Sequence, residues 1–166
     1  MKRLFLIFVL LINGCTSAPD GVTPVSKFDI NRYLGTWYEV ARLDHSFERG
    51  LRDVTADYSL RGDGGIHVVN RGIREETGEV SEAIGRAYPV GESSVAHLKV
   101  SFFGPFFGAY VVFELDPEYQ HAFVSGPSRE YLWLLARTPE VTEEVMTRFR
   151  SRARELGFSL GDLIIN

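Results

Sequence analysis

The chain has very little of what would place it in several common classes of protein. Cys15 is the only cysteine among 166 residues, so no disulfide can form within the chain. The longest apolar run, Leu4–Ile12, has nine residues, whereas a membrane-spanning helix needs roughly 20. Basic residues form no run before the C-terminal segment and the net charge is −4, so no nucleic-acid partner is expected. The absence of an internal repeat argues against a solenoid or a propeller.

Sequence signatures of catalysis are also missing. The chain has neither a Gly-x-Ser-x-Gly nor a His-Glu-x-x-His motif. We therefore expect a protein that is not an enzyme, with no catalytic residue, no metal site and no cofactor. Binding of haem through a histidine is the alternative left open. The four histidines lie in separate segments, where ordinary packing is their simplest role: His45, His67, His97 and His121.

The N-terminus has the pattern of a secretory signal peptide, because the basic residues Lys2 and Arg3 precede the apolar run. The segment that follows, Ile-Asn-Gly-Cys at residues 12–15, resembles the bacterial lipoprotein box. That resemblance implies cleavage before Cys15 and a diacylglyceryl thioether on its sulfur. Thr16 comes next, which by the same resemblance directs the protein to the outer membrane. Several acyl chains anchor a protein stably, so we expect a lipid-anchored protein whose barrel faces the periplasm.

These patterns divide the chain into three parts. Residues 1–14 are the expected signal peptide. Residues 15–27 are rich in Pro, Ser and Thr without periodicity, which predicts a lipidated tether. Residues 28–166 remain for one folded domain. The 45% hydrophobic and 13% aromatic composition of the whole chain is typical of a β-rich domain with a sizeable core.

The folded part contains eight candidate strands separated by turn signals. In Val95–Phe103, for example, apolar residues alternate with His97, Lys99 and Ser101, which is the pattern of a half-buried antiparallel strand. Eight strands joined by short turns predict a sandwich or an up-and-down barrel. The candidate strands are Trp37–Leu43, Arg52–Leu60, Ile66–Ile73, Val80–Tyr88, Val95–Phe103, Ala109–Leu115, Tyr119–Ser125 and Tyr131–Arg137.

One helix is predicted after the last strand. Thr138 is its expected N-cap, and Pro139 suits the first turn. Gly157 supplies the expected stop. An apolar stripe on one face is predicted to pack against the outside of the sheet. The stripe consists of Val141, Val145, Phe149, Ala153 and Leu156.

Two of these features together resemble the signature of the lipocalin family. They are the Gly35-Thr36-Trp37 motif at the start of the first strand and Arg137 at the end of the eighth. The runs Val40–Glu48 and Leu98–Phe106 are similar to those of bacterial outer-membrane and apolipoprotein D-like members. The resemblance implies an all-β fold, an eight-stranded antiparallel up-and-down barrel with one C-terminal helix packed on its outside. It also implies that Trp37 plugs the closed end and that Arg137 stacks on its indole.

The resemblance further implies a function, the storage or transport of fatty acids or (lyso)phospholipids for maintenance of the bacterial envelope. Two alternatives stay open. The protein is then either a carrier of another small lipophile, such as haem, or a purely structural envelope lipoprotein. A homodimer also stays open.

The candidate ligand-binding residues come from three strands and one turn. Strand alternation directs Leu98, Val100 and Phe102 inward, so they are expected to line an apolar pocket. The inward face of strands six and eight is less clear. Their candidates are Tyr110, Val112, Phe113 and Trp133.

The turn within Ser101–Tyr110, SFFGPFFGAY, is unusually apolar. In lipocalin topology it lies at the open mouth, so Phe106 and Phe107 are expected to rim the cavity and contact ligand or membrane. Folding back over the barrel wall or burial in a homodimer is the alternative. The long loop over residues 44–51 is the expected lid. Arg71 and Arg74 are candidates to meet an anionic head group.

Overall fold

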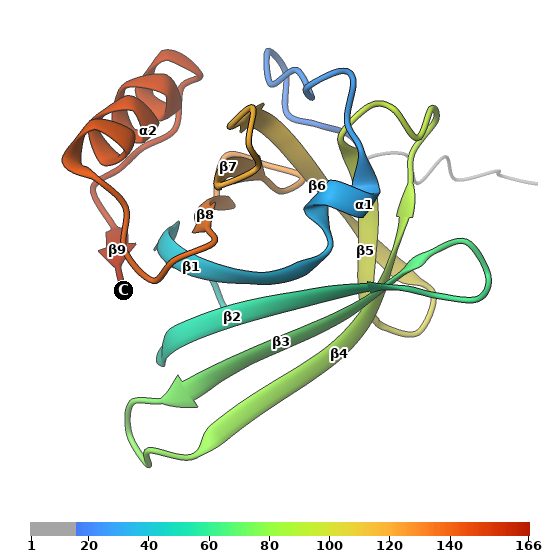
Figure 1. The fold of residues 1–166 in the computed structure, drawn as a ribbon. Coiled ribbons are helices and arrows are strands. Elements are labelled where there is room, and N and C mark those ends of the chain that lie inside the picture. The colour runs from blue at the N-terminus through green and yellow to red at the C-terminus, as the bar shows by residue number, and fades with distance from the viewer. Residues whose placement is uncertain (1–15) are drawn as a thin grey trace, which may run out of the picture.

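The computed structural model describes residues 16–166, so the predicted signal peptide and Cys15 lie outside the described residues. Within this range the chain forms nine strands and two helices, and most of the fold is sheet (Figure 1). None of the helices in residues 16–166 is long and apolar enough to cross a membrane. The strands are β1 (Gly35–Leu43), β2 (Leu51–Leu60), β3 (Ile66–Arg74), β4 (Val80–Pro89), β5 (His97–Phe103), β6 (Phe106–Leu115), β7 (His121–Ser125), β8 (Leu132–Ala136) and β9 (Leu163–Ile165).

Strands β1 to β8 form the predicted up-and-down barrel. Each strand from β2 to β7 pairs antiparallel with the one that follows it, and β1 closes the barrel by pairing with both β8 and β2. The connections after β1, β3, β5 and β7 therefore lie at one end, which we call the open end. Eight strands are enough to enclose side chains and one small ligand. The predicted all-β fold is confirmed.

The barrel wall is incompletely paired at the open end of β1. The first half of β1, Gly35–Tyr38, pairs with β2 at residues 55–58. The second half, residues 41–43, pairs instead with the short C-terminal strand β9. The first residues of β2 consequently pair with β3 alone. We call this interruption between β1 and β2 the seam.

Trp37 and Arg137 close the other end of the barrel. Trp37 is completely buried, and its Nε1 donates a hydrogen bond to the carbonyl of Tyr33. The guanidinium carbon of Arg137 lies 3.9 Å from the Trp37 ring centroid. Arg137 also donates to the carbonyls of Thr36 and Leu34, at 2.9 and 3.0 Å. This stacked arrangement is the one that the resemblance implied.

The C-terminal helix lies on the outside of the sheet, as predicted, but starts later. Helix α2 spans Glu143–Glu155, and its N-cap is Thr142, whose hydroxyl accepts from the backbone N–H of Val145. The predicted cap at Thr138 is wrong, because the Thr138 hydroxyl donates to the carbonyl of Glu140 and the chain bends before helical geometry begins. Gly157 ends the helix with φ +83°, a conformation that glycine adopts without strain.

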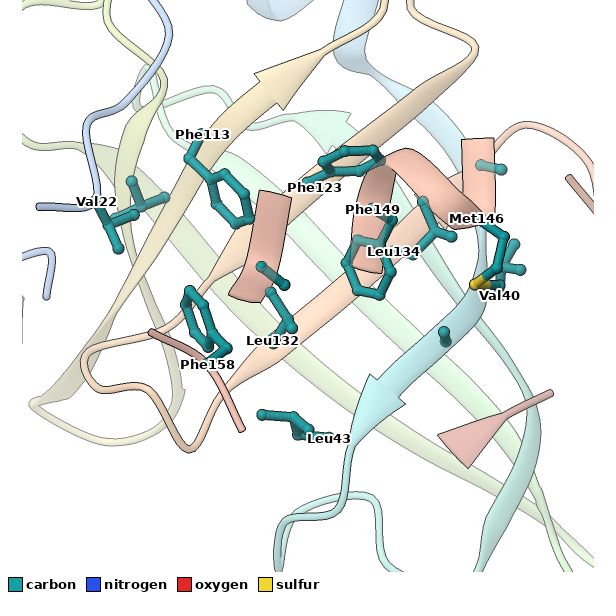
Figure 2. Close-up of a cluster of buried hydrophobic side chains, with 14 of the residues drawn as sticks. Val22, Val40, Leu43, Phe113, Phe123, Leu132, Leu134, Met146, Phe149 and Phe158 are labelled. Carbon is teal, nitrogen blue, oxygen red and sulfur yellow. The ribbon is translucent and has the colours of Figure 1, made fainter. Parts of the chain in front are cut away.

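The main hydrophobic core lies between α2 and the outer faces of β1, β6, β7 and β8. Figure 2 shows Phe113, Phe123, Phe149 and Phe158 gathered in this layer. The ring of Phe149 meets that of Phe123 edge to face, with 5.1 Å between centroids. Met146 and Ala153 complete the buried face of the helix. The short helix α1 (Ile30–Tyr33) crosses the closed end of the barrel instead (Figure 1).

Much of the segment predicted as a tether is packed against the barrel. Val22 is buried in the layer beneath α2. Val25 donates its backbone N–H to Val112 and accepts from that of Ala96, while Ser26 forms a bridge with Val95. The described part of residues 15–27 is therefore a strap along β5 and β6. Backbone pairing of this kind is invisible in a segment without periodicity.

Candidate functional site: the barrel interior

The barrel interior has an apolar wall that β5 supplies in large part. The structure places Leu98, Val100 and Phe102 on the interior face. Leu98 is buried together with Ile66 and Val68 of β3, whereas Val100 and Phe102 pack against that cluster and are half-buried. An inward side chain keeps accessible surface only where its surroundings are unfilled. The interior therefore contains open space beside Val100 and Phe102.

Gly108 marks the same space from the neighbouring strand. It lies directly opposite Val100 in the β5–β6 register, and residues opposite each other share one face of a sheet. A Cβ placed on Gly108 would meet no heavy atom within 4 Å. Gly85 on β4 behaves differently, because a Cβ there would come within 2.8 Å of the Phe102 ring. Phe102 thus covers β4 and leaves the space beside Gly108 open.

Tyrosine hydroxyls lie between this space and the closed end. The Tyr110 hydroxyl lies 2.7 Å from that of Tyr33 and 3.1 Å from that of Tyr58. Burial raises the pKa of all three phenols, so they are neutral hydrogen-bonding groups at ordinary pH. Val112, another β6 candidate, is fully buried in the cluster around Trp37. It therefore belongs to the closed end of the barrel.

A charged group lies inside the barrel near the seam. Glu39 pairs with Leu135 and Arg42 with Trp133 in the β1–β8 register, so both point inward. Only 5% of Glu39 and 1% of Arg42 is exposed. Nη1 of Arg42 donates to Oε1 of Glu39 at 2.8 Å. Asn166 at the end of the chain donates from Nδ2 to the same oxygen, also at 2.8 Å.

Arg42 also holds the loop between β1 and β2, which is the predicted lid. Its Nη2 donates to the backbone carbonyls of Glu48 and Leu51, at 2.9 and 3.2 Å. The Glu48 carboxylate turns inward and accepts from Nε1 of Trp133 at 3.0 Å. Nε2 of His45 lies 3.0 Å from the same carboxylate. One arginine thus bridges the seam and fastens the loop to the barrel.

The two glutamates of this group titrate in opposite directions. Burial, with the nearby Glu48 carboxylate, raises the pKa of Glu39 to about 8 despite the adjacent Arg42. Burial also acts to raise the pKa of Glu48, but the His45 ring and the Trp133 N–H outweigh it and hold that pKa below its usual range. The interior near neutral pH therefore holds one proton on Glu39 and a negative charge on Glu48, balanced by Arg42.

Two candidate residues lie outside the barrel. Phe113 is buried in the layer under α2, because β6 is covered on its outer face as well as its inner one (Figure 2). Phe107 lies on the outer wall, where its ring is 6.2 Å from that of Tyr88 and 5.1 Å from Nζ of Lys99. The interpretation of these two as ligand contacts is wrong. Of the alternatives considered for Phe107, folding back over the wall is the one observed.

The remaining candidates near the mouth have separate positions. Phe106 begins β6 at the hairpin tip with 77% of its surface exposed. Arg71 lies on the outer face, where it forms ion pairs with Asp57 and Glu82 at 2.7 and 2.8 Å, so it is not free for a head group at the mouth. Arg74 is exposed at the open end of β3, and its Nη2 donates to the hydroxyl of Ser81. Trp133 faces inward as proposed and is held by Glu48.

Glu39, Arg42 and Glu48 were not foreseen as site residues. The cause is a β-bulge in β1, where the register with β8 skips one residue between Glu39 and Ala41. The extra residue turns both Glu39 and Arg42 inward, although strict alternation places them on opposite faces. A signal was nevertheless present, because four charged residues occur within the ten positions 39–48, which run into the lid.

The comparison with known proteins decides the family. The profile of the lipocalin-like domain matches residues 28–166, which contain the whole barrel. The chain belongs to the lipocalin-like family. This lipocalin is 59% identical over 166 residues to the outer membrane lipoprotein Blc of Vibrio cholerae, in an alignment that covers 99% of this chain and 97% of that protein. It is 52% identical over 156 residues to the protein of the same name from Escherichia coli K12, covering 93% and 88% of the two chains.

More distant relatives agree with this assignment. The lipocalin is 33% identical over 133 residues to bovine apolipoprotein D, covering 75% of this chain and 69% of that protein. The solved structure of insecticyanin from the tobacco hornworm superposes with a TM-score of 0.72 at 18% identity, covering 90% of this chain and 85% of that one, and so supports the fold. The predicted family and the outer-membrane location are confirmed, and the protein is a lipid-anchored outer-membrane lipoprotein with a ligand-binding barrel.

Proposed function

We propose that this lipocalin holds one acyl chain of a fatty acid or lysophospholipid inside its barrel and stores or moves that lipid for the bacterial envelope. The observation that carries the proposal is the unfilled interior beside Val100, Phe102 and Gly108. Its walls are apolar, and burial of each methylene there is worth about 0.8 kcal/mol. A long acyl chain is the common ligand chemistry that benefits from such a lining.

The ends of the interior suggest how the ligand is oriented. The closed end is filled by Trp37 and Val112, which are completely buried. The open end carries the charged group of Arg42 and Glu48 beneath the lid. We therefore infer that the methyl end of the lipid points towards Trp37 and that its polar end stays near the mouth. A phosphate or carboxylate there would contact Arg42 only if the Glu48 side chain moved away from it.

The anchor and the barrel together form the proposed carrier. Cys15 is the proposed lipidation site, and it immediately precedes the first described residue. No sequence or structural feature of residues 16–166 favours catalysis over binding, and the proposed role requires no catalytic residue. Among the histidines in this range, only His45 lies beside the interior, and it packs against Tyr131 and Trp133. Haem binding is thus left as one outcome of the test.

Mass spectrometry of the protein from Thr16 onward tests the proposal. The protein is purified, measured under native conditions and extracted for lipid analysis. Stoichiometric fatty acid or lysophospholipid that exchanges with added lipid is the expected result. A Soret band, together with haem in the extract, would show instead that the protein is a haem carrier. A barrel that is empty and also takes up no added fatty acid or lysophospholipid would contradict the proposal and favour a structural lipoprotein.

A further inference from the structure

The outer wall of β4, β5 and β6 combines exposed apolar residues with cations. Three of the most exposed large apolar side chains lie together at the open half of this wall: Ile84 at 56%, Phe103 at 70% and Phe106 at 77% exposure. Phe103 and Phe106 face each other across the hairpin turn of Gly104 and Pro105. Apolar residues concentrated at one such place usually mark an interaction surface.

Basic side chains continue this surface along the wall. Nζ of Lys99 and the guanidinium carbon of Arg86 lie 5.1 and 5.4 Å from the centroid of the Phe107 ring. Nη2 of Arg86 also donates to the carbonyl of Gly104 at the hairpin tip. Within residues 16–166, neither Lys99 nor Arg86 is among the cations that form an ion pair with a carboxylate. An aromatic and basic surface of this kind matches the headgroup region of a bilayer.

The first described residue, Thr16, lies on the same wall. His97, which starts β5, donates from Nε2 to the carbonyl of Thr16 at 2.7 Å. Cys15 immediately precedes Thr16 in the sequence, so an anchor on Cys15 is joined to the chain next to this point. Phe103 is six positions after His97 on β5, which corresponds to about 20 Å along the strand. An anchor at Cys15 therefore has almost no free chain with which to reach a bilayer elsewhere.

We propose that the β4–β6 wall is a bilayer-docking surface, on which the lipidated protein lies with Phe103 and Phe106 in the acyl-chain boundary and Lys99 and Arg86 against anionic phospholipid headgroups. The partner is a phospholipid surface and no protein is required. In this orientation the barrel lies on its side, with the part of its open end at Phe103 and Phe106 against the membrane. The proposal rests on an anchor at Cys15 and does not depend on which ligand the barrel holds.

Depth-dependent fluorescence quenching tests the surface. The full lipidated protein, with its anchor verified by mass, is reconstituted in vesicles that contain 30% phosphatidylglycerol as a probe composition, with bromine on the acyl chains of part of the lipid. A tryptophan is introduced by Phe103→Trp, and the unmodified protein provides the background of Trp37 and Trp133. Leu60→Trp is the matched control, because Leu60 is 58% exposed but ends β2 at the closed end.

We expect brominated lipid to lower the emission added by Phe103→Trp at least twofold and to leave that added by Leu60→Trp unchanged. Lys99→Gln should weaken the quenching at position 103 in anionic vesicles and not in neutral ones. Arg150→Gln, which removes one exposed charge from α2, should have no effect. Lys99 is the better choice than Arg86, whose bond to Gly104 supports the hairpin itself.

Two results would overturn the proposal. One is equal quenching at positions 103 and 60, or none at either. The other concerns quenching of the tryptophan at position 103 by aqueous iodide. If this tryptophan is protected from iodide only at a high protein-to-lipid ratio and becomes accessible on dilution in the bilayer, the surface is a contact between copies of the protein. Thermal unfolding of each variant, expected to match the unmodified protein, separates these results from misfolding. Lipid found or not found in the barrel has no bearing on any of them.

Discussion

Gly108 and Val100 lie opposite each other on the inner face of the β5–β6 pair, and the glycine leaves the space in front of the valine empty. Filling that space tests where the ligand lies. Gly108→Leu should lower the amount of copurified lipid several-fold, because the isobutyl group would occupy the room needed by an acyl chain. Stability should not fall, since glycine inside a strand is itself unfavourable. Lipid mass spectrometry and thermal unfolding measure the two effects.

Gly108→Ala is the graded control for this experiment. It adds a single methyl group where at least 4 Å is free, so most of the lipid should remain bound. If Gly108→Leu retained a full equivalent of lipid while remaining folded, the ligand would have to lie elsewhere.

Arg137 closes the barrel by donating hydrogen bonds from its guanidinium group to several backbone carbonyls at once, and a lysine ammonium cannot reproduce that planar arrangement of donors. Besides Thr36 and Leu34 it donates to the carbonyl of Arg32 at 2.9 Å. Arg137→Lys should lower the free energy of unfolding by about 2 kcal/mol or more, because carbonyls lose their donors and the stacking on Trp37 weakens. Urea unfolding followed by tryptophan emission measures the change. Arg150→Lys on the exposed face of α2 should change it by less than about 0.5 kcal/mol.

Glu39 makes stability depend on pH in a defined window. Its pKa is about 8 in the folded protein and 4.5 as its ordinary value, so the folded state retains a proton that the unfolded state has released. The stabilisation from this group is complete below pH 4.5 and is lost as the pH rises towards and through 8. In Glu39→Gln the amide stays neutral, so the decline between these values should be smaller than in the unmodified protein.

Urea unfolding at a series of pH values checks this difference. Glu76→Gln, in the exposed turn between β3 and β4, should leave the profile of the unmodified protein unchanged. The informative quantity is the difference between Glu39→Gln and the unmodified protein, because every other ionisable group is common to both. Parallel profiles would show that Glu39 is ionised throughout.

The sequence predicted most of the fold because alternation, turn residues and the paired Trp37 and Arg137 motifs all indicate one topology. It predicted the inward residues of β5 for the same reason, since that strand is solvated on its other face. It failed for Phe113, whose strand is covered on both sides and carries no alternation. It also failed for Phe107, because a turn of only Gly104 and Pro105 lets β6 begin earlier and turns that ring outward.

The charged interior was not predicted for a different reason. Glu39 and Arg42 point inward together only because a bulge shifts the register by one residue. Likewise, the strap over residues 22–26 depends on pairing with strands about 70 to 90 positions away, which no local pattern records.

The seam between β1 and β2 has a consequence for how the barrel deforms. Within the sheet of β2, β3 and β4, widening the mouth would break backbone hydrogen bonds, whereas β4 pairs with β5 only over residues 86–89 and lacks that pairing towards the open end. At the seam the two strands are joined instead by the Arg42 guanidinium and the carbonyls of Glu48 and Leu51. Loss of the Arg42 contacts would therefore allow the open-end half of β2, β3 and β4 to move outward as one unit without breaking the backbone pairing among these three strands. The barrel mouth is therefore most compliant at the two edges of this three-stranded sheet, and one of those edges runs beside the lid.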